Sequence, residues 1–586
     1  MNTDSPSSSL RASLQYEPVP LKFGTSGRRG KVADLTQLEI YINALAELEY
    51  LQSLDRVAGG IVKGDPFYFA CDLRPSTTRY VPELEGRGEL AQAIVRAIQD
   101  AGMQPINLGF MPTPALTFYA LEQGKGSIMV TGSHIPFDRN GYKTNSAKGE
   151  LLKKDESPIN ERVEAVRRRI YAEPFERSLF DRNGFFKSGH AELPPTIPAA
   201  RDAYLDRYVR FFGNRSLAGL RLLAYQHSAV GRDLLVEILT KLGAEVIPVG
   251  RSDTFVPIDT ENIDAEQLDA VRRLALDAWA KSGPFDAVVS TDGDSDRPLI
   301  LGLEPTAESS SPCRVKFFSG DLVGMVAAIY LGADAVVVPV TCNDAIDRGP
   351  LQPILEPKTR IGSPQVIAGL QAAQAKGRRA ICGWEPNGGF LTGSDLMKDG
   401  RELKALPTRD AMLPILSVLA TMKAPQIPMT AVFARLPKRF SKAALLKNFP
   451  RPVSHQIIAR FTPPEARIKE VVYQPCGFTC RDANGLDLPD SGRFDAREVR
   501  KTLAGFFRAA DGFGAIEKLN FIDGLRVYFS NGDVAHVRPS GNADELRIYA
   551  VADTSPRADR IAALGIAEPD GILRTIANAV GATTEA

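Results

Sequence analysis

Apolar and polar residues follow two different periods along this chain. Short apolar runs predict buried strands, and between them apolar residues recur every three or four positions, as in helices that pack on a sheet. The first such stretch comprises, in the order strand, helix, strand, helix, strand, Phe67–Asp72, Glu89–Gly102, Gln104–Gly109, Ala115–Glu122 and Gly126–Thr131. Because strands alternate with helices, we expect the strands to lie parallel in one sheet.

The same alternation recurs twice further along the chain. The second stretch comprises Leu220–Gln226, Gly231–Gly243, Ala244–Gly250, Glu266–Ser282 and Phe285–Ser290, again beginning and ending with a strand. The third comprises the helix Gly320–Leu331, the strand Ala335–Val340, the helix Val366–Lys376, the strand Arg378–Gly383 and the helix Arg409–Met422. Thr408 is the expected N-cap of the last helix. The pattern thus predicts three related α/β units with parallel or mixed sheets.

The C-terminal part has a different pattern. Two apolar stretches, Leu525–Phe529 and Val534–Arg538, flank a turn that contains Asn531-Gly532. This dipeptide favours a tight β-hairpin, and a further strand is expected at Glu545–Val551. A smaller α+β domain is therefore predicted here.

Polar or proline-rich stretches separate these regions near Leu193–Pro198, Leu303–Pro312 and Ala424–Pro428. The predicted fold class is α/β with four domains, of which three are related mixed or parallel α/β/α units and the fourth is smaller. The expected organisation is a disordered, Ser-rich tail over 1–20 and domains over 21–198, 199–305, 306–427 and 428–586.

Length, charge and composition mainly exclude classes of partner. The chain has 586 residues, too many for one hydrophobic core, and 71 basic against 70 acidic residues give a net charge of +1. With no global positive field and no apolar run of about 20 residues, neither nucleic acid nor membrane is an expected partner. The N-terminus has no apolar segment typical of a secretory signal. The six cysteines are scattered, and Cys476 and Cys480 form the only close pair, so free thiols in a reducing cytoplasm are expected.

The segment Asp292-Gly293-Asp294-Ser295-Asp296-Arg297 is the most informative one. Three carboxylates alternate directly after an apolar strand, and alternate residues of an extended loop point to one side. Their oxygens can therefore converge on one hard cation, for which Mg²⁺ is the best candidate. A calcium-binding EF-hand loop would need Gly at its sixth position and Glu at its twelfth, where this chain has Arg297 and Leu303. A solvated turn with capping aspartates is the remaining alternative.

Ser133 lies in Thr131-Gly132-Ser133-His134-Ile135-Pro136, which also follows an apolar strand. The sequence around it is not the Gly-x-Ser-x-Gly elbow of acyl-transfer enzymes. A serine that carries phosphate beside Mg²⁺ fits better, since the metal could hold a phosphate oxygen. Lys143 could supply a proton path or a positive charge, and His134 either shapes the loop or carries a proton. Taken alone, Ser133 could equally be an ordinary turn residue.

Three further polar loops could bind a phosphorylated sugar. In Arg538-Pro539-Ser540-Gly541-Asn542, with Arg547 nearby, an arginine fork and backbone N–H groups could hold phosphate. In Glu385-Pro386-Asn387-Gly388-Gly389, a carboxylate and an amide could hold sugar hydroxyls. The Gly-rich segment Phe23–Gly30 carries Arg28 and Arg29 and could contact phosphate. A surface turn, an ordinary glycine-rich loop and a flexible lead-in are the respective alternatives.

Together, and in this order, the five loops resemble those of the α-D-phosphohexomutase family over about Lys22 to Ala550. The resemblance implies four domains in a heart-like arrangement. It marks Ser133 as the phosphorylated serine, and the residues that match the Mg²⁺ ligands are Ser133, Asp292, Asp294 and Asp296. Its other catalytic matches are Arg29, His134, Lys143 and Arg297. Its substrate-binding matches are Glu385, Asn387, Arg538, Ser540, Gly541, Asn542 and Arg547.

Some positions depart from the family pattern. Gly132, Ile135 and Ser295 differ from the family's usual residues. In the segment Glu385–Gly389, called the sugar loop below, Asn387 stands where a serine is usual and the family's histidine is missing. The stretch Lys148–Pro198 is longer than the resemblance requires. The preference among mannose, glucose and glucosamine is therefore open.

The resemblance implies a mutase that interconverts hexose 6-phosphate and hexose 1-phosphate through a 1,6-bisphosphate, which also serves as activator. Phosphomannomutase is the first expectation and phosphoglucomutase the second. A non-catalytic sugar-phosphate sensor and a Mg²⁺-dependent phosphatase are further alternatives. The expected partner is a small sugar phosphate, and the expected state is a monomer or homodimer in the cytoplasm.

Overall fold

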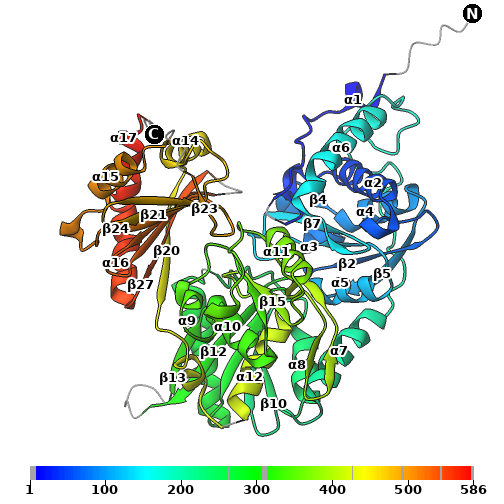
Figure 1. Cartoon of the computed structure of the whole chain (residues 1–586). Coiled ribbons are helices and arrows are strands. Elements are labelled where there is room, and N and C mark those ends of the chain that lie inside the picture. Colours follow the sequence, from blue (N-terminus) through cyan, green and yellow to red (C-terminus); the bar gives the residue numbers. More distant parts are fainter. Residues whose placement is uncertain are drawn as a thin grey trace, which may run out of the picture. The chain divides into compact units, whose positions relative to one another are not determined.

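The computed structural model describes residues 8–24, 26–261, 263–306, 313–424, 426–489, 494–540 and 544–581 (Figure 1). The chain divides into two compact units. The first is Met1–Ala333 with Gln374–Val432, and the second is Asp334–Ala373 with Phe433–Ala586.

The first sheet of the first unit has the strand order β1-β7-β6-β2-β5, with β8 beside β7. Its strands are β1 (Arg28–Lys31), β2 (Pro66–Cys71), β5 (Gln104–Phe110), β6 (Ser127–Val130), β7 (Arg139–Ser146) and β8 (Gly149–Glu150). β2 is parallel to β5 and β6, which confirms the predicted parallel strands. β7 and β1 add antiparallel strands that were not predicted, because both are rich in polar residues.

Helices and a short hairpin accompany this sheet. They are α2 (Gln37–Ser53), α3 (Pro75–Thr78), α4 (Leu90–Asp100), α5 (Thr113–Glu122) and α6 (Glu156–Tyr171), with the strands β3 (Tyr80–Val81) and β4 (Arg87–Gly88). Contacts join α2 to α4 and α6, and α5 to β2 and β6. Buried apolar residues of α2, α4, α6, β2 and β6 form one continuous core.

The prediction of a disordered tail over residues 1–20 is wrong for residues 8–20. A short helix, α1 (Leu10–Ser13), is capped by Ser9, and Leu10 is fully buried. The Leu10 N–H donates to the Glu173 carbonyl, and the Gln15 N–H donates to the Arg182 carbonyl. The tail is therefore held by the long stretch 148–198, which lies too far along the sequence for a local pattern to reveal the contact.

The second sheet has the order β10-β9-β11-β12-β13. Its strands are β9 (Arg221–His227), β10 (Glu245–Arg251), β11 (Ala287–Thr291), β12 (Pro298–Pro305) and β13 (Cys313–Phe318), and its helices are α7 (Ala199–Phe212), α8 (Arg232–Lys241) and α9 (Ala265–Ser282). β12 and β13 pair antiparallel across the expected boundary at 305/306. That boundary is therefore misplaced, since the polar stretch near it joins two paired strands.

The rest of the first unit contains α10 (Gly320–Leu331), β15 (Ile381–Trp384), β16 (Phe390–Thr392), β17 (Leu396–Lys398), β18 (Arg401–Leu403), β19 (Leu406–Asp410), α12 (Met412–Lys423) and most of α13 (Met429–Phe433). β16 pairs antiparallel with both β15 and β19. Thr408 and Arg409 lie in β19, and Ala411 is the N-cap of α12. The predicted cap at Thr408 and helix start at Arg409 are therefore wrong, because the sheet takes up residues that could also begin a helix.

The second unit holds an eight-stranded antiparallel sheet in the order β20-β27-β26-β25-β24-β21-β22-β23. Its strands are β20 (Phe440–Lys447), β21 (Glu470–Gln474), β22 (Gly477–Arg481), β23 (Asp487–Leu488), β24 (Ile516–Asn520), β25 (Leu525–Phe529), β26 (Val534–Pro539) and β27 (Glu545–Ala552). Its helices are α14 (Arg451–Phe461), α15 (Ala496–Phe506), α16 (Ser555–Ile566) and α17 (Ile572–Ala579). The hairpin predicted around Asn531-Gly532 is confirmed, because Tyr528 pairs with Val534 across the turn.

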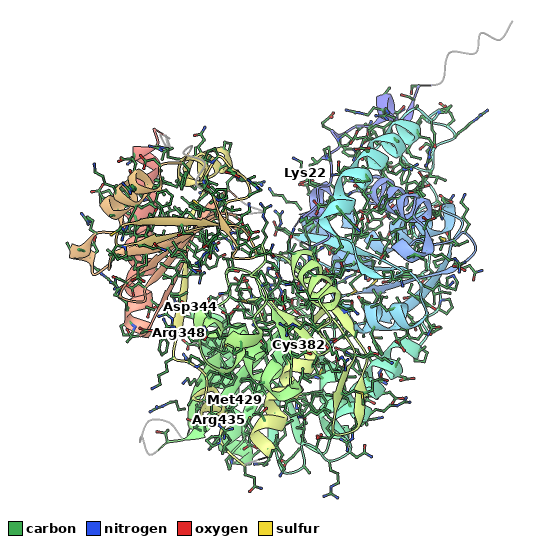
Figure 2. All side chains as sticks on the ribbon, viewed as in Figure 1. Lys22, Asp344, Arg348, Cys382, Met429 and Arg435 are labelled. Atoms are coloured by element: carbon green, nitrogen blue, oxygen red, sulfur yellow. The ribbon has the colours of Figure 1, made fainter. Side chains whose placement is uncertain are left out.

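The segment 334–373 also belongs to the second unit and contains β14 (Ala335–Val337), the 3₁₀ turns Asp344–Asp347 and Gly349–Ile354, and most of α11 (Ser363–Ala375). Arg439 forms two hydrogen bonds with Asp344, at 2.6 and 2.7 Å, and Arg348 reaches Asp553 at 3.1 Å. Asp344 and Arg348 are labelled in Figure 2. Because Arg439 is fully buried, the paired charges tie this segment to the C-terminal sheet.

Two sequence expectations concern covalent and membrane features. None of the six cysteines, all of which lie in the described ranges, forms a disulfide, and only Cys476 is exposed. Within the described ranges, no helix combines the length and the hydropathy needed to cross a bilayer.

Candidate active site

The site is built on loops that follow strand ends in the first unit. The loop of Ser133 follows β6, the loop 292–297 follows β11, and the loop of Glu385 follows β15. Ligands commonly bind at the carboxyl ends of parallel strands. A hydrogen bond from Ser133 to Asp292 joins the first two loops, and Arg409 joins Asp296 to Glu385.

The carboxylates of Asp292, Asp294 and Asp296 form a compact, buried triad. One oxygen from each lies within 4.8 Å of the others, and none of the three residues is more than 1% exposed. Such proximity is unfavourable without compensating positive charge. The alternation seen in the sequence therefore does bring the three acids to one point.

Asp292 is held from both sides. Its Oδ2 accepts a hydrogen bond of 2.8 Å from the Ser133 hydroxyl, and its Oδ1 accepts from the N–H groups of Asp296 and Arg297 at 3.1 Å. Burial, together with the neighbouring charges of Asp294 and Asp296, raises the pKa of Asp292 well above its usual value. Ser133 and the acidic loop, 159 residues apart, are thus in direct contact.

Lys143 supplies positive charge to the other two acids. Its Nζ lies 2.8 Å from Oδ2 of both Asp294 and Asp296, and the Thr113 hydroxyl donates to Asp294 Oδ2 at 2.6 Å. Burial alone would raise the pKa of Asp294, but the charge and hydrogen bonds of Lys143 hold it well below its usual range. The pKa of Asp296 is also lowered against the effect of burial, first by Arg409.

The second oxygens of the same two acids fit a cation. Among the described residues, no group donates a hydrogen bond to Oδ1 of Asp294 or of Asp296, although both atoms are buried. The Arg297 Nε lies 3.6 Å from Asp296 Oδ1, which is an ion-pair distance. Buried oxygens without a donor are costly, and a hard divalent cation would satisfy them. The triad is therefore suited to Mg²⁺.

The backbone at Ser133 has a left-handed conformation with φ of 55°. Gly293 allows the acidic loop to approach this residue, because a Cβ atom there would lie 2.6 Å from the Ser133 carbonyl oxygen. This conformation is uncommon for a non-glycine residue and often marks a functional position. The close approach explains why the acidic loop has glycine between its first two aspartates.

Arg74 and Asp72, which the sequence analysis missed, shape the Ser133 loop. The Arg74 guanidinium donates to the carbonyls of Ser133 at 3.0 Å, Pro136 at 2.7 Å and Arg139 at 2.8 Å, and also to that of Ile135. Asp72 Oδ2 accepts from the Thr131 hydroxyl at 2.7 Å. Asp72 is the last residue of the predicted strand Phe67–Asp72, and Arg74 lies two residues beyond it. This position at the end of a strand is the one signal that could have revealed them.

Arg409 was also missed, and it links two of the loops. Its Nε and Nη2 donate to Asp296 Oδ2 at 3.0 and 2.9 Å, while its Nη1 donates to Glu385 Oε2 at 2.9 Å. The Asn387 side chain accepts from the Gly389 N–H at 2.9 Å, and its carbonyl accepts from the Thr260 hydroxyl at 2.8 Å. Glu385 therefore belongs to the charged centre, whereas the Asn387 oxygens support the loop itself.

Three other expected residues surround the same centre. The Arg29 Nη1 donates to the Arg28 carbonyl at 3.0 Å, and burial lowers the pKa of Arg29 to about 10. The His134 Nδ1 lies 3.4 Å from the Ser133 hydroxyl oxygen. Burial and then the charge of Arg297 lower the pKa of His134 well below its usual value, so its ring is neutral at pH 7.

The residues expected to bind the second phosphate belong to the second unit. Arg538 and Arg547 are paired across β26 and β27, and Arg538 Nε lies 3.8 Å from Asp523 Oδ1. The Ser540 N–H donates to the Glu545 carbonyl at 3.0 Å. Gly541 and Asn542 lie outside the described residues. The predicted phosphate-binding role of this loop remains a prediction.

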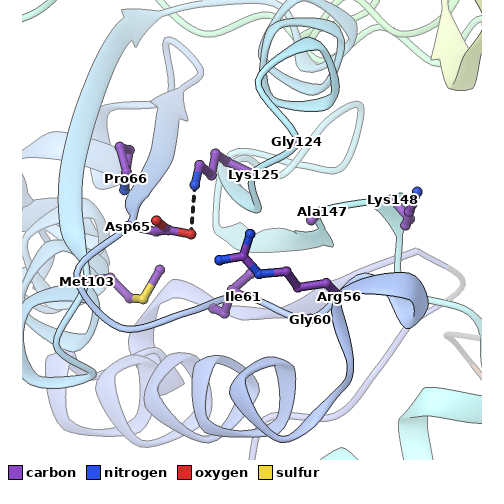
Figure 3. A pocket seen from close by; sticks show the side chains of 10 residues that line it. All are labelled: Arg56, Gly60, Ile61, Asp65, Pro66, Met103, Gly124, Lys125, Ala147 and Lys148. Atoms are coloured by element: carbon purple, nitrogen blue, oxygen red, sulfur yellow. Dashed lines mark ion pairs between the residues drawn. The ribbon is translucent and has the colours of Figure 1, made fainter.

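A cavity of about 160 Å³ lies away from these residues, where β2 begins (Figure 3). Arg56, Lys125 and Lys148 line it together with Asp65, which pairs with Lys125 at 2.7 Å. None of the expected site residues lines this cavity, so its location is no guide to the chemistry.

Family models and relatives show which family the chain belongs to. The phosphoglucomutase/phosphomannomutase α/β/α domain I model matches residues 86–169, and the C-terminal domain model of the same family matches residues 493–564. A phosphomannomutase of Sinorhizobium fredii (strain NBRC 101917 / NGR234) is 34% identical over 548 residues, which are 93% of this chain and 98% of the relative. The chain belongs to the phosphohexomutase family.

Further comparisons extend to the fold. A phosphomannomutase of Salmonella muenchen is also 34% identical, over 92% of this chain and 94% of the relative. A phosphoglucomutase/phosphomannomutase family protein from Burkholderia thailandensis has a TM-score of 0.60 at 17% identity, with 95% of this chain and 97% of that one covered. The Paramecium phosphoglucomutase parafusin has a TM-score of 0.52 at 16% identity, with 96% and 95% covered. The chain is thus a phosphohexose mutase, an isomerase with the multidomain α/β fold of its family.

Proposed function

We propose that this phosphohexomutase interconverts mannose 6-phosphate and mannose 1-phosphate, with Ser133 as the phosphate carrier. The observation that carries the mechanism is the 2.8 Å hydrogen bond between Ser133 and Asp292 inside the buried triad. Support for mannose comes from the two relatives that match nearly the whole chain, both named phosphomannomutase.

The reaction consists of two phosphoryl transfers. In the first, the bond between phosphorus and the Ser133 oxygen breaks as a sugar hydroxyl oxygen bonds to the same phosphorus, and the proton lost by the sugar hydroxyl is replaced by one gained by the released Ser133 oxygen. The product is a hexose 1,6-bisphosphate. After it turns over, its other phosphate returns to Ser133 and the remaining sugar phosphate is released. Free 1,6-bisphosphate would therefore phosphorylate an unmodified Ser133 and act as activator.

Side chains at Ser133 can handle the proton and the charge. Neutral His134, 3.4 Å from the Ser133 oxygen, can take or return a proton there. Lys143 stays beside Asp294 and Asp296 and stabilises negative charge that develops on the transferring group. Arg29 and Arg297 are suited to contact the phosphate oxygens that do not react.

We assign a Mg²⁺ site to Asp292, Asp294 and Asp296, with Ser133 completing it through its oxygen or its phosphate. The two Oδ1 atoms that lack donors among the described residues support this assignment. When bound, Mg²⁺ would act as a Lewis acid toward a phosphate oxygen.

The sugar and its second phosphate are assigned to the other loops. Glu385, with Asn387 in the same loop, would receive sugar hydroxyls, and the substrate is a small sugar phosphate. The group that would hold the phosphate that is not reacting comprises Arg538, Ser540, Gly541, Asn542 and Arg547. Arginine forks and backbone N–H groups suit this task.

Intact mass spectrometry tests the phosphoserine directly. Incubation with a hexose 1,6-bisphosphate and Mg²⁺ should add one phosphate to the wild type and none to Ser133→Ala. A matched control is Ser76→Ala, since Ser76 is also a buried hydroxyl in the first unit. Phosphate that survives Ser133→Ala, or steady release of inorganic phosphate, would contradict the mutase mechanism.

Phosphoglucomutase activity is the second candidate, because the sugar loop lacks the family's histidine and has Asn387 in place of serine. Initial rates with mannose 1-phosphate and glucose 1-phosphate, each with its bisphosphate activator, separate the two. Mannose 1-phosphate should have the higher kcat/KM. A preference for glucose of more than about tenfold, or ~1.4 kcal/mol, would reverse the assignment.

A further inference from the structure

Arg409 is the one described side chain that joins the acidic triad to the sugar loop through hydrogen bonds to both Asp296 and Glu385. It is only 4% exposed, and the two carboxylates occupy different edges of its planar guanidinium. A planar fork offers separate nitrogens to two carboxylates and fixes their relative orientation, whereas an ammonium such as that of Lys143 draws two carboxylates to one nitrogen.

The fork also decides which oxygen of Asp296 is left for a metal. Arg409 and Lys143 both donate to Oδ2, whereas among the described residues Oδ1 receives no hydrogen bond. Outer contacts of this kind orient the ligands of a metal site and change its affinity. On its other side Arg409 holds Oε2 of Glu385, and the sugar loop packs on its stem. A Cβ atom at Gly389 would lie 2.5 Å from Arg409 Cδ.

The neighbouring residue, Asp410, is held by several hydrogen bonds. Both oxygens of Asp410 accept hydrogen bonds from tyrosine hydroxyls of α7, from Tyr204 at 2.5 Å and from Tyr208. The Met412 N–H also donates to Asp410 at 2.9 Å, and all four residues are at most 1% exposed. Because Arg409 directly precedes Asp410 in the chain, the hydrogen bonds that hold Asp410 also limit the positions that the Arg409 guanidinium can take.

We propose that Arg409 is a positioning residue that couples metal binding at the triad to sugar binding at Glu385. This inference rests on the proposed function of both loops. A cation that fixes Asp296 fixes the fork, and the fork in turn fixes Glu385, so less freedom is lost when the sugar binds. By reciprocity, the sugar must strengthen Mg²⁺ binding by the same factor.

Calorimetry can measure this coupling without turnover. Mg²⁺ is titrated into the unphosphorylated protein, with no 1,6-bisphosphate present, in three series: alone, with saturating mannose 1-phosphate, and with saturating inorganic phosphate. Phosphate reports the effect of its charge, and the sugar phosphate adds the effect of the hydroxyls. With Arg409 intact, we expect the sugar phosphate to tighten Mg²⁺ binding about tenfold more than phosphate does, within the usual range for coupled sites.

Two arginine substitutions separate the fork from its charge. Arg409→Lys keeps the charge but has one nitrogen where Arg409 places three on the separate edges that face Asp296 and Glu385. It should therefore reduce the difference in Mg²⁺ affinity between sugar phosphate and phosphate to less than twofold. Arg401→Gln in β18 removes an exposed arginine whose Nη1 donates to the Phe212 backbone carbonyl, and should leave the difference unchanged. The difference in question is that between sugar phosphate and phosphate in their effect on Mg²⁺ affinity. The inference is overturned if this difference persists in Arg409→Lys, if it is lost in Arg401→Gln, or if the protein with Arg409 intact shows no difference.

The anchor at Asp410 gives a second, milder test should Arg409→Lys fail to fold. Tyr204→Phe removes one hydroxyl and should raise KM for mannose 1-phosphate several-fold while kcat stays within about twofold. An unchanged KM would count against the inference. If the sugar phosphate tightens Mg²⁺ binding but the wild type never becomes phosphorylated at Ser133, the proposed mechanism is wrong and the role of Arg409 is not. If Ser133 is phosphorylated but the sugar phosphate does not tighten Mg²⁺ binding, the role of Arg409 is wrong and the mechanism is not.

Discussion

At the scale of single residues, the charged centre depends on which oxygen of each carboxylate is already bonded. Asp292 is saturated by Ser133 and by backbone N–H groups, whereas Asp294 and Asp296 each keep one oxygen without a donor among the described residues. Arg74 acts on the backbone of the Ser133 loop, where its hydrogen bonds determine which carbonyl oxygens are already bonded. Its bonds to successive carbonyls hold the serine in a conformation that a free loop would rarely adopt.

Arg74→Lys should therefore damage catalysis more than stability. Lysine keeps the charge but cannot reach the same set of carbonyls, so the Ser133 oxygen would shift relative to Asp292. A misplacement of about 1 Å can cost about 100-fold in rate, and we expect kcat to fall by that order. Steady-state kinetics and the rate of Ser133 phosphorylation measure the effect.

Arg79→Lys is the matched control, because Arg79 is exposed and lies five residues after Arg74 in the chain. It should keep kcat within about twofold. Equal losses in the two variants would show that Arg74 does not act through the Ser133 loop.

At the scale of elements, the sheets contain polar strands and buried titratable groups that the apolar pattern passes over. β26 contains the fully buried His536, whose Nε2 lies 2.6 Å from the Asp523 carbonyl oxygen. Burial and then the charge of Arg526 lower the pKa of His536 well below its usual value. This histidine is neutral in the folded sheet.

The sign of the pH effect follows from that direction. An unfolded histidine titrates near pH 6.5, so below this pH the unfolded chain binds a proton that the folded chain does not. The second unit should be most stable above pH 6.5. It should lose up to about 1.4 kcal/mol per pH unit from this residue as the pH falls toward the folded pKa. Denaturant unfolding at several pH values measures the slope.

His536→Gln should flatten this slope, since glutamine can keep a donor near the Asp523 carbonyl without titrating. His455→Gln serves as the control, because His455 is exposed on α14. A slope that survives His536→Gln would place the acid sensitivity elsewhere.

At the scale of the whole molecule, the chain forms two units that do not follow the order of the sequence. Residues 334–373 belong with the C-terminal sheet although the flanking segments belong to the first unit. The buried pair of Arg439 and Asp344 is a main tie between this segment and β20 to β27.

Asp344→Asn should loosen that segment selectively. Arg439 would keep Asp553 but lose two charge-assisted bonds, and breaking a buried pair typically costs about 3–5 kcal/mol. Hydrogen exchange measured by mass spectrometry should increase in 334–373 and near Phe440, and remain unchanged around β6 and β11.

Asp395→Asn is the control for this experiment, since the pair of Asp395 with Lys404 is half-exposed and should matter little. Faster exchange throughout both units after Asp344→Asn would mean that the pair supports the whole chain rather than this segment.

The sequence by itself determined the parts of this protein that depend on local order. Apolar periodicity predicted β2, β5 and β6 as parallel strands, and the alternation of Asp292, Asp294 and Asp296 predicted that their carboxylates converge. The Asn531-Gly532 turn predicted its hairpin. The family resemblance rests on the same local motifs, and the relatives confirm it.

Tertiary structure decided what distant residues do to one another. Arg409 looked like the start of a helix and is instead a buried link between two loops, because β19 pairs with β16. Residues 8–20 looked disordered and are held by residues near 173 and 182. Arg74 gave no sign of its four carbonyl contacts. A local pattern records which residues can be buried or helical, but the free energy of an ion pair depends on a partner that only the folded chain brings near.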